Sequence, residues 1–274
     1  MATRKINFRL ISQIVFFILI AVVTISHGLV ETGVDVGNLP SSSIHSVCPF
    51  GGVVSIYRFV TAGNYVQKIH QSSFVLMTLV FISALIFGPV FCGWVCPFGS
   101  FQEWLGKIGK RIFKRRYNSF IPHNIDKLLG FMRYAVLVWV VYVTAVSAKL
   151  IFAEYDPYNA LFTFWTSEAQ LAGIVVLVLV IVASMFVERP WCKYACPYGA
   201  LLGLTNLIRP VSIKRNPDTC ISCSKCDRVC PMNINVSGVK NVRDVRCISC
   251  LECTSEAACP VKDTVNMALG APRR

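Results

Sequence analysis

Eight cysteines between residues 220 and 259 have the spacing of iron–sulfur ligands. The first group reads Cys220-x2-Cys223-x2-Cys226-x3-Cys230-Pro, and the second reads Cys247-x2-Cys250-x2-Cys253-x5-Cys259-Pro. Such short spacing lets three thiolates of one loop reach three irons of a cubane, and the fourth cysteine, followed by proline, ligates the other cluster. The pattern predicts two [4Fe–4S] clusters, one held by Cys220, Cys223, Cys226 and Cys259 and the other by Cys247, Cys250, Cys253 and Cys230.

Two zinc sites are the alternative interpretation of these eight cysteines. Zinc ribbons usually present two well-separated C-x2-C pairs, whereas each group here is a triplet followed by Cys-Pro. The spacing therefore favours [4Fe–4S] clusters. The second group has five residues before Cys259 where three are usual, so we expect a small bulge there. Cys259 is the predicted fourth ligand of the first cluster, and this bulge makes it the least secure of the eight assignments.

Four further cysteines form two copies of the motif Cys-x3-Cys-Pro-aromatic-Gly, at Cys92 and Cys96 and at Cys192 and Cys196. If a helix continues through the motif, positions i and i+4 put both thiols on one face, and the proline stops that helix or starts a new one. Free cysteines can also pack as small apolar residues. The repetition favours a metal or iron–sulfur site, with redox-active thiols as a second interpretation.

The elements that must position these cysteines are four apolar stretches of spanning length, at residues 10–30, 72–91, 130–152 and 171–187. Hydrophobic residues make up 54% of the chain and its mean hydropathy is +0.57, above the roughly 45–50% apolar content of soluble domains. We predict a mainly α membrane protein. A four-transmembrane-helix bundle built from a duplicated two-helix unit would occupy residues 1–211, and a small α+β ferredoxin-like domain with two [4Fe–4S] clusters would occupy residues 212–274.

The net charge of +13 would suit a nucleic-acid partner, but its placement excludes one, because the basic residues gather beside the apolar stretches. Between the second and third stretches stand Lys107, Lys110, Arg111, Lys114, Arg115, Arg116 and Lys127. The loop between the third and fourth stretches holds Glu154, Asp156 and Glu168 instead. This bias predicts a multi-pass protein of a prokaryotic cytoplasmic (inner) membrane, surrounded by lipid, with both termini in the cytoplasm. The amphipathic segment 102–116 would lie on the inner leaflet or serve only as a topology anchor.

The two halves of the membrane part repeat the same order of features. The first predicted outer loop holds Cys48-Pro-Phe-Gly and the second holds Asp156-Pro-Tyr-Asn, which indicates a parallel internal duplication. Cys48 and Asp156 would then be counterparts on the outer face, where they could contact a metal, a quinol or a partner protein, and an incidental turn motif is the equal alternative. His45 and His70 lie on the same side and could accept quinol protons, although an ordinary polar loop residue is the stronger interpretation of each taken singly.

The whole chain resembles the NapH/MauN-type membrane iron–sulfur proteins, within a superfamily that includes the NosR-type proteins. The segments FCGWVCP and WCKYACPYGAL and the two tail motifs carry this resemblance. It implies a menaquinol or ubiquinol dehydrogenase subunit that passes electrons toward an extracytoplasmic reductase, such as periplasmic nitrate reductase. Copper-reducing accessory proteins of cytochrome oxidase share the same core.

We therefore expect an electron-transfer subunit that moves electrons between the quinone pool or a cytoplasmic donor and an extracytoplasmic redox partner. Its partners would be other redox subunits, such as a reductase, a cytochrome or flavoprotein, and a cytoplasmic iron–sulfur protein. Two alternatives stay open: a copper reductase or cofactor-maturation factor, and a redox sensor. Cysteine spacing does not fix the direction of electron flow, because thiolate clusters cover potentials from about −700 to +450 mV.

Overall fold

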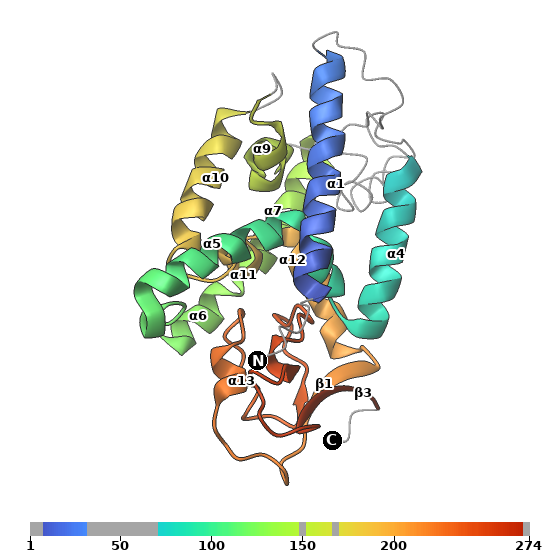
Figure 1. Ribbon diagram of the computed structural model, residues 1–274. Coiled ribbons are helices and arrows are strands. Elements are labelled where there is room, and N and C mark those ends of the chain that lie inside the picture. The colour runs from blue at the N-terminus through green and yellow to red at the C-terminus, as the bar shows by residue number, and fades with distance from the viewer. Residues whose placement is uncertain (1–7, 32–70, 148–151, 166–169, 271–274) are drawn as a thin grey trace.

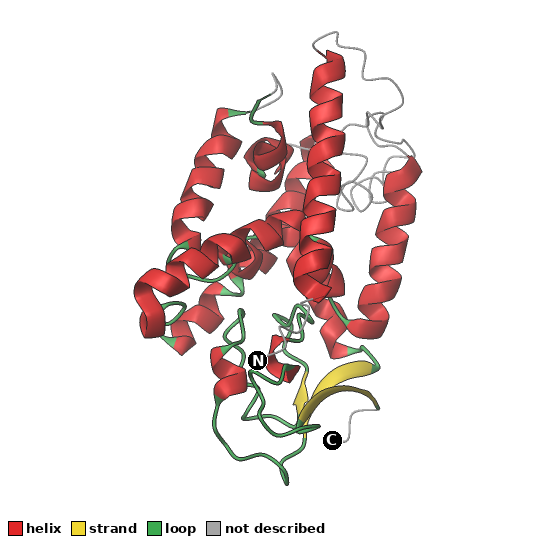
Figure 2. Cartoon of the chain, viewed as in Figure 1, coloured by secondary structure: helices red, strands yellow, loops and turns green. Residues whose placement is uncertain are grey.

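The computed structural model describes residues 8–31, 71–147, 152–165 and 170–270, and its features are given for these ranges. The described residues up to 210 form a helical part, hereafter called the helical half. Residues 211–270 form the tail, which contains a small sheet and lies below the helices (Figures 1 and 2). The helices are α1 (Phe8–Glu31), α4 (Gln71–Phe87), α5 (Pro97–Phe113), α6 (His123–Leu129), α7 (Met132–Ser147), α8 (Phe152–Tyr155), α9 (Pro157–Thr163), α10 (Leu171–Ser184), α11 (Pro190–Tyr194), α12 (Pro197–Leu204) and α13 (Lys225–Arg228). The strands are β1 (Val211–Arg215), β2 (Asn241–Val242) and β3 (Val265–Leu269).

Two segments are long and apolar enough to cross a membrane by length and composition. They are Phe8–Val30, which is almost all of α1, and Asn124–Thr144, which covers most of α6 and most of α7. Shorter apolar helices cover Val75–Phe87 and Leu171–Ser184, within α4 and α10. The prediction of a mainly helical protein with a small sheet is confirmed, and the count of four membrane spans stays a prediction.

Large apolar side chains face outward on all four of these helices. Val15 on α1, Val75 on α4, Val138 on α7 and Leu179 on α10 each expose more than half of their surface. Large apolar side chains exposed in this number are unfavourable in water and typical of faces that meet lipid or another protein.

The second and fourth apolar helices end before the Cys-x3-Cys motifs. α4 ends at Phe87, and Gly88 follows with a φ of +80°, a left-handed conformation that favours glycine. A π-helical turn over Phe91–Val95 then carries Cys92. The two thiols are therefore not held on one continuous spanning helix. Each motif proline starts a new helix instead, Pro97 for α5 and Pro197 for α12, as proline at the first helical position allows.

Helix α5 runs across the helical half rather than parallel to its long helices (Figure 1). It packs against both α1 and α10, and its buried face includes Phe98, Gln102 and Glu103, while Lys107 and Lys110 stay exposed. The segment that the sequence predicts as an amphipathic surface helix is thus also a brace between two long helices.

The tail is organised by a three-stranded antiparallel sheet with the order β2–β1–β3. In its register Ile213 of β1 pairs with Val242 of β2 on one side and with Met267 of β3 on the other. Ile213 and Val242 are buried in a core with Met232 and several of the cysteines. The cysteine loops therefore fold over one face of this sheet.

Candidate iron–sulfur sites

The two cysteine groups of the tail adopt the same local backbone. In each group the residues just before and just after the middle cysteine have left-handed φ values: Ser222 and Ser224 beside Cys223, and Ser249 and Leu251 beside Cys250. Alternation of right- and left-handed residues turns successive N–H groups toward one side and forms a concavity that suits anions, including iron–sulfur clusters. The backbone thus fits the cofactor that the spacing predicts.

Cys230 lies with the second group although it belongs to the first in sequence. A small cavity in the tail is lined by Cys230, Cys247, Cys250 and Cys253 together with apolar side chains. Burial and the neighbouring thiols of Cys250 and Cys247 raise the pKa of Cys230. These four residues are the predicted ligands of the second cluster, and their convergence is the arrangement that cross-ligation requires.

The predicted ligands of the first cluster are less enclosed than those of the second. Cys226 is buried, whereas Cys220 and Cys223 are partly exposed. A backbone N–H of Ser222 and the side chain of Arg215 lower the pKa of Cys220. Cys259 packs against the core of the tail, and its Sγ lies 3.4 Å from the carbonyl oxygen of Val261. The assignment of Cys259 to the first cluster stays a prediction.

The four cysteines of the Cys-x3-Cys motifs converge between the helical half and the tail. Cys92 comes from the π-helical turn and Cys192 from α11, while Cys96 and Cys196 are the N-cap residues of α5 and α12. Burial first, and then the neighbouring thiols, raise the pKa values of Cys92, Cys96 and Cys196, the value for Cys96 to about 12. Hereafter we call these four residues the membrane-edge cysteines.

Polar groups are aimed at these sulfurs. The backbone N–H of Gly199 donates to Cys196 Sγ at 3.3 Å, and Gln102 Nε2 donates to Cys192 Sγ at 3.5 Å. Arg189 is fully buried and its Nη1 donates to the carbonyl oxygen of Cys92 at 2.6 Å. Sulfur atoms in an apolar packing role need no such donors.

A buried ion network surrounds Glu103 beside these cysteines. Arg9 Nη2 and Arg189 Nη2 lie 2.5 and 2.6 Å from Glu103 Oε2. Burial alone would raise the pKa of Glu103, but the two guanidinium groups hold it below its usual value. Arg9 also pairs with Glu252 of the second cysteine group, so the network joins α1, α5 and the tail.

The buried part of the described chain holds more cations than carboxylates. The buried cations are Arg9, Arg133, Arg189, Lys193, Arg209 and Arg246, and the buried carboxylates are Glu103, Asp126 and Glu188. Isolated buried charges are costly unless they are compensated. Thiolate-bound iron–sulfur clusters are negatively charged and would supply this compensation, because Arg209 Nη2 lies 3.8 Å from Cys247 Sγ and Arg189 lies beside the membrane-edge cysteines.

Sequence reasoning missed the residues that hold the tail against the helices. Arg209 donates to the carbonyl oxygen of Phe87 at 3.2 Å and to Ser249 Oγ at 2.6 Å, and Arg246 of the tail lies 3.8 Å from the fully buried carboxylate of Asp126 on α6. Their partners are far away in sequence, so no local pattern signals them. The sequence offered one clue, because Arg246 stands directly before Cys247, the first cysteine of the second tail group.

The outer-face candidates are only partly within the described residues. Cys48, His45 and His70 lie outside them. Asp156 is a half-buried residue at the N-cap of α9, where its carboxylate accepts the backbone N–H of Tyr158 at 3.1 Å. Burial raises the pKa of Asp156 to about 7. A helix cap explains this position, and its correspondence with Cys48 stays a prediction.

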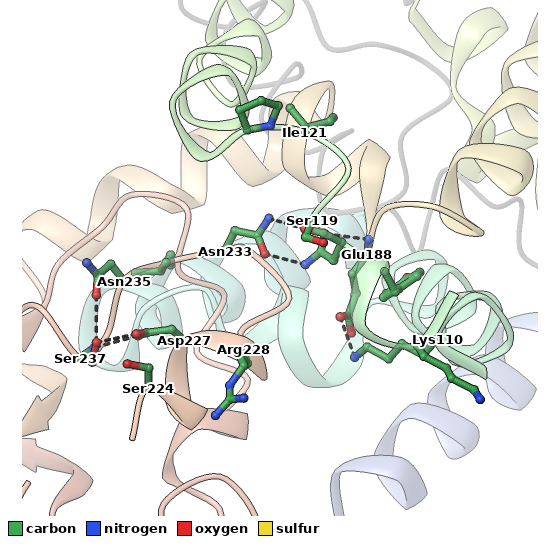
Figure 3. A pocket seen from close by; sticks show the side chains of 15 residues that line it. Lys110, Ser119, Ile121, Glu188, Ser224, Asp227, Arg228, Asn233, Asn235 and Ser237 are labelled. Carbon is green, nitrogen blue, oxygen red and sulfur yellow. Dashed lines mark hydrogen bonds and ion pairs between the residues drawn. The ribbon is translucent and has the colours of Figure 1, made fainter. Parts of the chain in front are cut away.

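A pocket of about 910 Å³ lies where the tail meets the end of α5 (Figure 3). Its wall includes Ser224, Asp227 and Arg228 from the first cysteine group, and Lys110 and Glu188 form an ion pair of 2.8 Å at another part of the wall. No group of three His, Cys, Asp or Glu side chains in the described ranges is placed to hold one metal ion.

Comparison with known proteins identifies iron–sulfur sequences in both halves of the helical part. Residues 69–116 and 169–216 each match a 4Fe-4S binding domain. The two matches have equal length and begin at residues 69 and 169, so Cys92 and Cys192 occupy equivalent positions in them, as do Cys96 and Cys196. Both matches end before Cys220, so the tail motifs are additional to them.

Three curated relatives cover much of the chain. YccM of Escherichia coli, whose name assigns it to electron transport, is 28% identical over 230 residues, or 82% of this chain and 63% of YccM. The methylamine utilization ferredoxin-type protein MauN of Methylobacillus flagellatus is 27% identical over 207 residues, 71% of this chain and 66% of MauN. The ferredoxin-type protein NapH of Haemophilus influenzae is 28% identical over 156 residues, 56% of this chain and 51% of NapH. The chain thus spans about half to two thirds of these relatives.

No solved structure matches the chain significantly. The relatives confirm the resemblance to NapH/MauN-type proteins that the motifs indicate. Together with the duplicated 4Fe-4S binding domain they support an iron–sulfur electron-transfer role, and with the apolar helices they support a membrane protein.

Proposed function

Because the chain is related to the ferredoxin-type 4Fe-4S electron-transfer proteins, we propose that it is a membrane-bound iron–sulfur electron-transfer subunit. Clusters of this type, when bound, supply one-electron transfer over a wide range of potentials. The observation that carries the proposal is the repeated loop backbone of the two tail groups, which presents N–H groups and thiols to a common centre. Within it, Cys220, Cys223, Cys226 and Cys259 hold one cluster and Cys247, Cys250, Cys253 and Cys230 hold the other.

The residues of the chain do three things for these cofactors. Cys230 and Cys253 come from two separate loops and line the same cavity, so a cluster held by both thiols would join the two loops. Arg209 places a positive charge 3.8 Å from Cys247 Sγ, which offsets negative charge at that ligand. The sheet and the helical half exclude water from the second group, which lies in the buried core of the tail.

The helical half is the membrane anchor in this proposal. α1, α4, α7 and α10 are its four spans, and residues 1–211 and 212–274 are its two domains, with both termini in the cytoplasm of a prokaryotic cell. α10 has 14 residues, which at about 1.5 Å per residue spans less than a hydrocarbon core of about 30 Å. The helix therefore needs its apolar flanks, or a locally thinner bilayer, to cross.

The redox partners follow from where the two domains lie. The cytoplasmic tail would exchange electrons with the quinone pool or a cytoplasmic iron–sulfur protein, and the membrane domain would serve an extracytoplasmic reductase, cytochrome or flavoprotein. Asp156 is a candidate proton acceptor for quinol on the outer side, because desolvation raises the pKa of its carboxyl group to about 7, which suits proton uptake near neutral pH. Reduction of copper, maturation of a partner's cofactor, or sensing of the quinone pool are the competing functions.

Reconstitution in liposomes separates these functions. The purified protein should show reduction of its clusters by menaquinol, or reduction of menaquinone by dithionite-reduced protein, as followed by electron paramagnetic resonance (EPR). Copper(II) reduction without either quinone reaction would move the assignment to a copper reductase. Iron and sulfide analysis should show loss of iron in a Cys223→Ser and in a Cys250→Ser variant, and unchanged iron in both would contradict the tail assignment itself.

A further inference from the structure

We infer that Cys92, Cys96, Cys192 and Cys196 together hold a third [4Fe–4S] cluster at the junction of the helical half and the tail. The inference rests on the proposed iron–sulfur function and extends it to a second part of the chain. The first argument is convergence. Cys92 and Cys192 pack against the same buried core of the tail, Cys92 and Cys196 pack against the same core of the helical half, and Cys96 packs against a neighbouring core that shares Trp191 with it. The four residues meet in this way although the two pairs stand a hundred residues apart in sequence.

The backbone around the site favours a negatively charged ligand set. Cys96 and Cys196 each cap a helix whose first residue is proline, so the N-termini of α5 and α12 both point at the sulfurs. α5 is 17 residues long, and the positive end of its dipole stabilises thiolate at the cap. The N–H of Gly199 already donates to Cys196 Sγ at 3.3 Å, which is the kind of N–H···S bond that tunes bound clusters.

The side chains around the site add positive charge and hydrogen-bond donors. Arg189 is fully buried and its positive charge lies near Cys192 and Cys96, while Gln102 Nε2 reaches Cys192 Sγ at 3.5 Å. Glu103 balances only part of the charge, because it faces both Arg189 and Arg9. A cluster with four thiolates carries a net negative charge and would balance the remainder.

The position of the site adds a further argument. Cys92 and Cys192 pack against the core that contains the second tail group. A Cβ atom at Gly93 would lie 2.6 Å from the carbonyl oxygen of Ile248 and 3.2 Å from the Cα atom of Cys250. The backbones of the two sites are thus in direct contact, as closely spaced one-electron centres need.

Metal analysis and spectroscopy of the full-length protein test the inference. Anaerobically purified wild-type protein should contain roughly twelve irons and twelve sulfides per chain, and a variant with all four membrane-edge cysteines replaced by serine should contain roughly eight of each. About eight in both proteins would overturn the inference, and so would a loss of one metal ion without sulfide. If the four residues are redox thiols instead, they will react with maleimide in the mildly reduced wild-type protein, and the wild type and the fourfold variant will contain the same amount of iron. That result would also overturn the inference.

A second variant covers the case in which the fourfold variant does not fold. Gln102→Leu keeps all ligands and removes one N–H···S bond, so we expect an unchanged iron content and altered EPR g-values for one cluster only. Unchanged spectra for all clusters would contradict the site. Tail variants at Cys223 and Cys250 distinguish the failures: if they lose iron and the membrane-edge variants do not, only the third cluster is wrong.

Discussion

The two cysteine groups of the tail share a backbone but differ in their surroundings. Ile221 and Ile248 stand at equivalent positions after the first cysteine of each group, and they are 62% and 6% exposed. Ser222 is exposed, whereas its counterpart Ser249 is buried and donates to the carbonyl oxygen of Phe87 at 2.9 Å. One loop type therefore faces solvent in the first group and the helical half in the second.

This difference separates two roles that one sequence motif cannot distinguish. The second group is fastened to the helices by Trp94, whose Nε1 donates to the carbonyl oxygen of Ser249 at 3.1 Å, and by Arg209. The first group borders the pocket of Figure 3 instead. Under the proposed function, the first group would exchange electrons with a soluble partner, and the second would pass them to or from the helical half.

The largest effect is expected when the charges that fasten the second group are unbalanced. Glu103→Gln leaves Arg9 and Arg189 without their shared carboxylate, and breaking such a buried pair costs about 3–5 kcal/mol. The thermal unfolding temperature of the detergent-solubilised protein should fall clearly. Glu252→Gln is the matched control, because Glu252 is the half-exposed partner of Arg9 and such pairs contribute at most about 1 kcal/mol. An equal fall in unfolding temperature in the two variants would show that the buried pairs of Glu103 contribute no more to stability than the exposed pair of Glu252.

A smaller effect is expected from crowding the contact between the second group and the helices. Gly93→Ala places a methyl group 2.6 Å from the carbonyl oxygen of Ile248, and overpacking of this kind costs about 1–3 kcal/mol. The EPR signal of the second cluster should broaden or shift. Gly238→Ala near the first group meets only the flexible side chain of Asn235 and should leave all signals as they are. The comparison between the groups fails if both substitutions disturb the spectra alike.

A third effect concerns the reduction potential of the second cluster. Arg209→Met removes a buried charge near Cys247 and should lower that potential by about 50–100 mV, since one charge about 8 Å away at an effective dielectric constant near 20 contributes about 2 kcal/mol. EPR-monitored redox titration measures the change. The control is Lys214→Met on β1, whose exposed Nζ bonds only the carbonyl oxygen of Leu269 among the described partners. A potential that moves equally in both variants would rule out a specific role for Arg209.

Local patterns predicted the cysteine chemistry, and long-range contacts decided the rest. The spacing of Cys247, Cys250 and Cys253 lies within one loop, so sequence alone indicates what that loop can bind. The end of α4 depended on Gly88 and its left-handed backbone, which a run of apolar residues does not reveal. The pairing of Arg9 with Glu103 spans 94 residues, and no periodicity in the sequence connects them.

The smallest effect is expected at the first cluster. Asp227 lies beside Cys226 and accepts hydrogen bonds from the N–H of Ser237 at 2.8 Å and from its hydroxyl at 2.5 Å. Asp227→Asn removes a negative charge there and should raise the potential of the first cluster slightly, while the second cluster keeps its value. Because Asp227 is only partly buried, salt screens its charge, and the difference between variant and wild type should shrink between low and high ionic strength. A shift that is independent of salt would mean that the first group is as enclosed as the second, which would contradict the distinction between them.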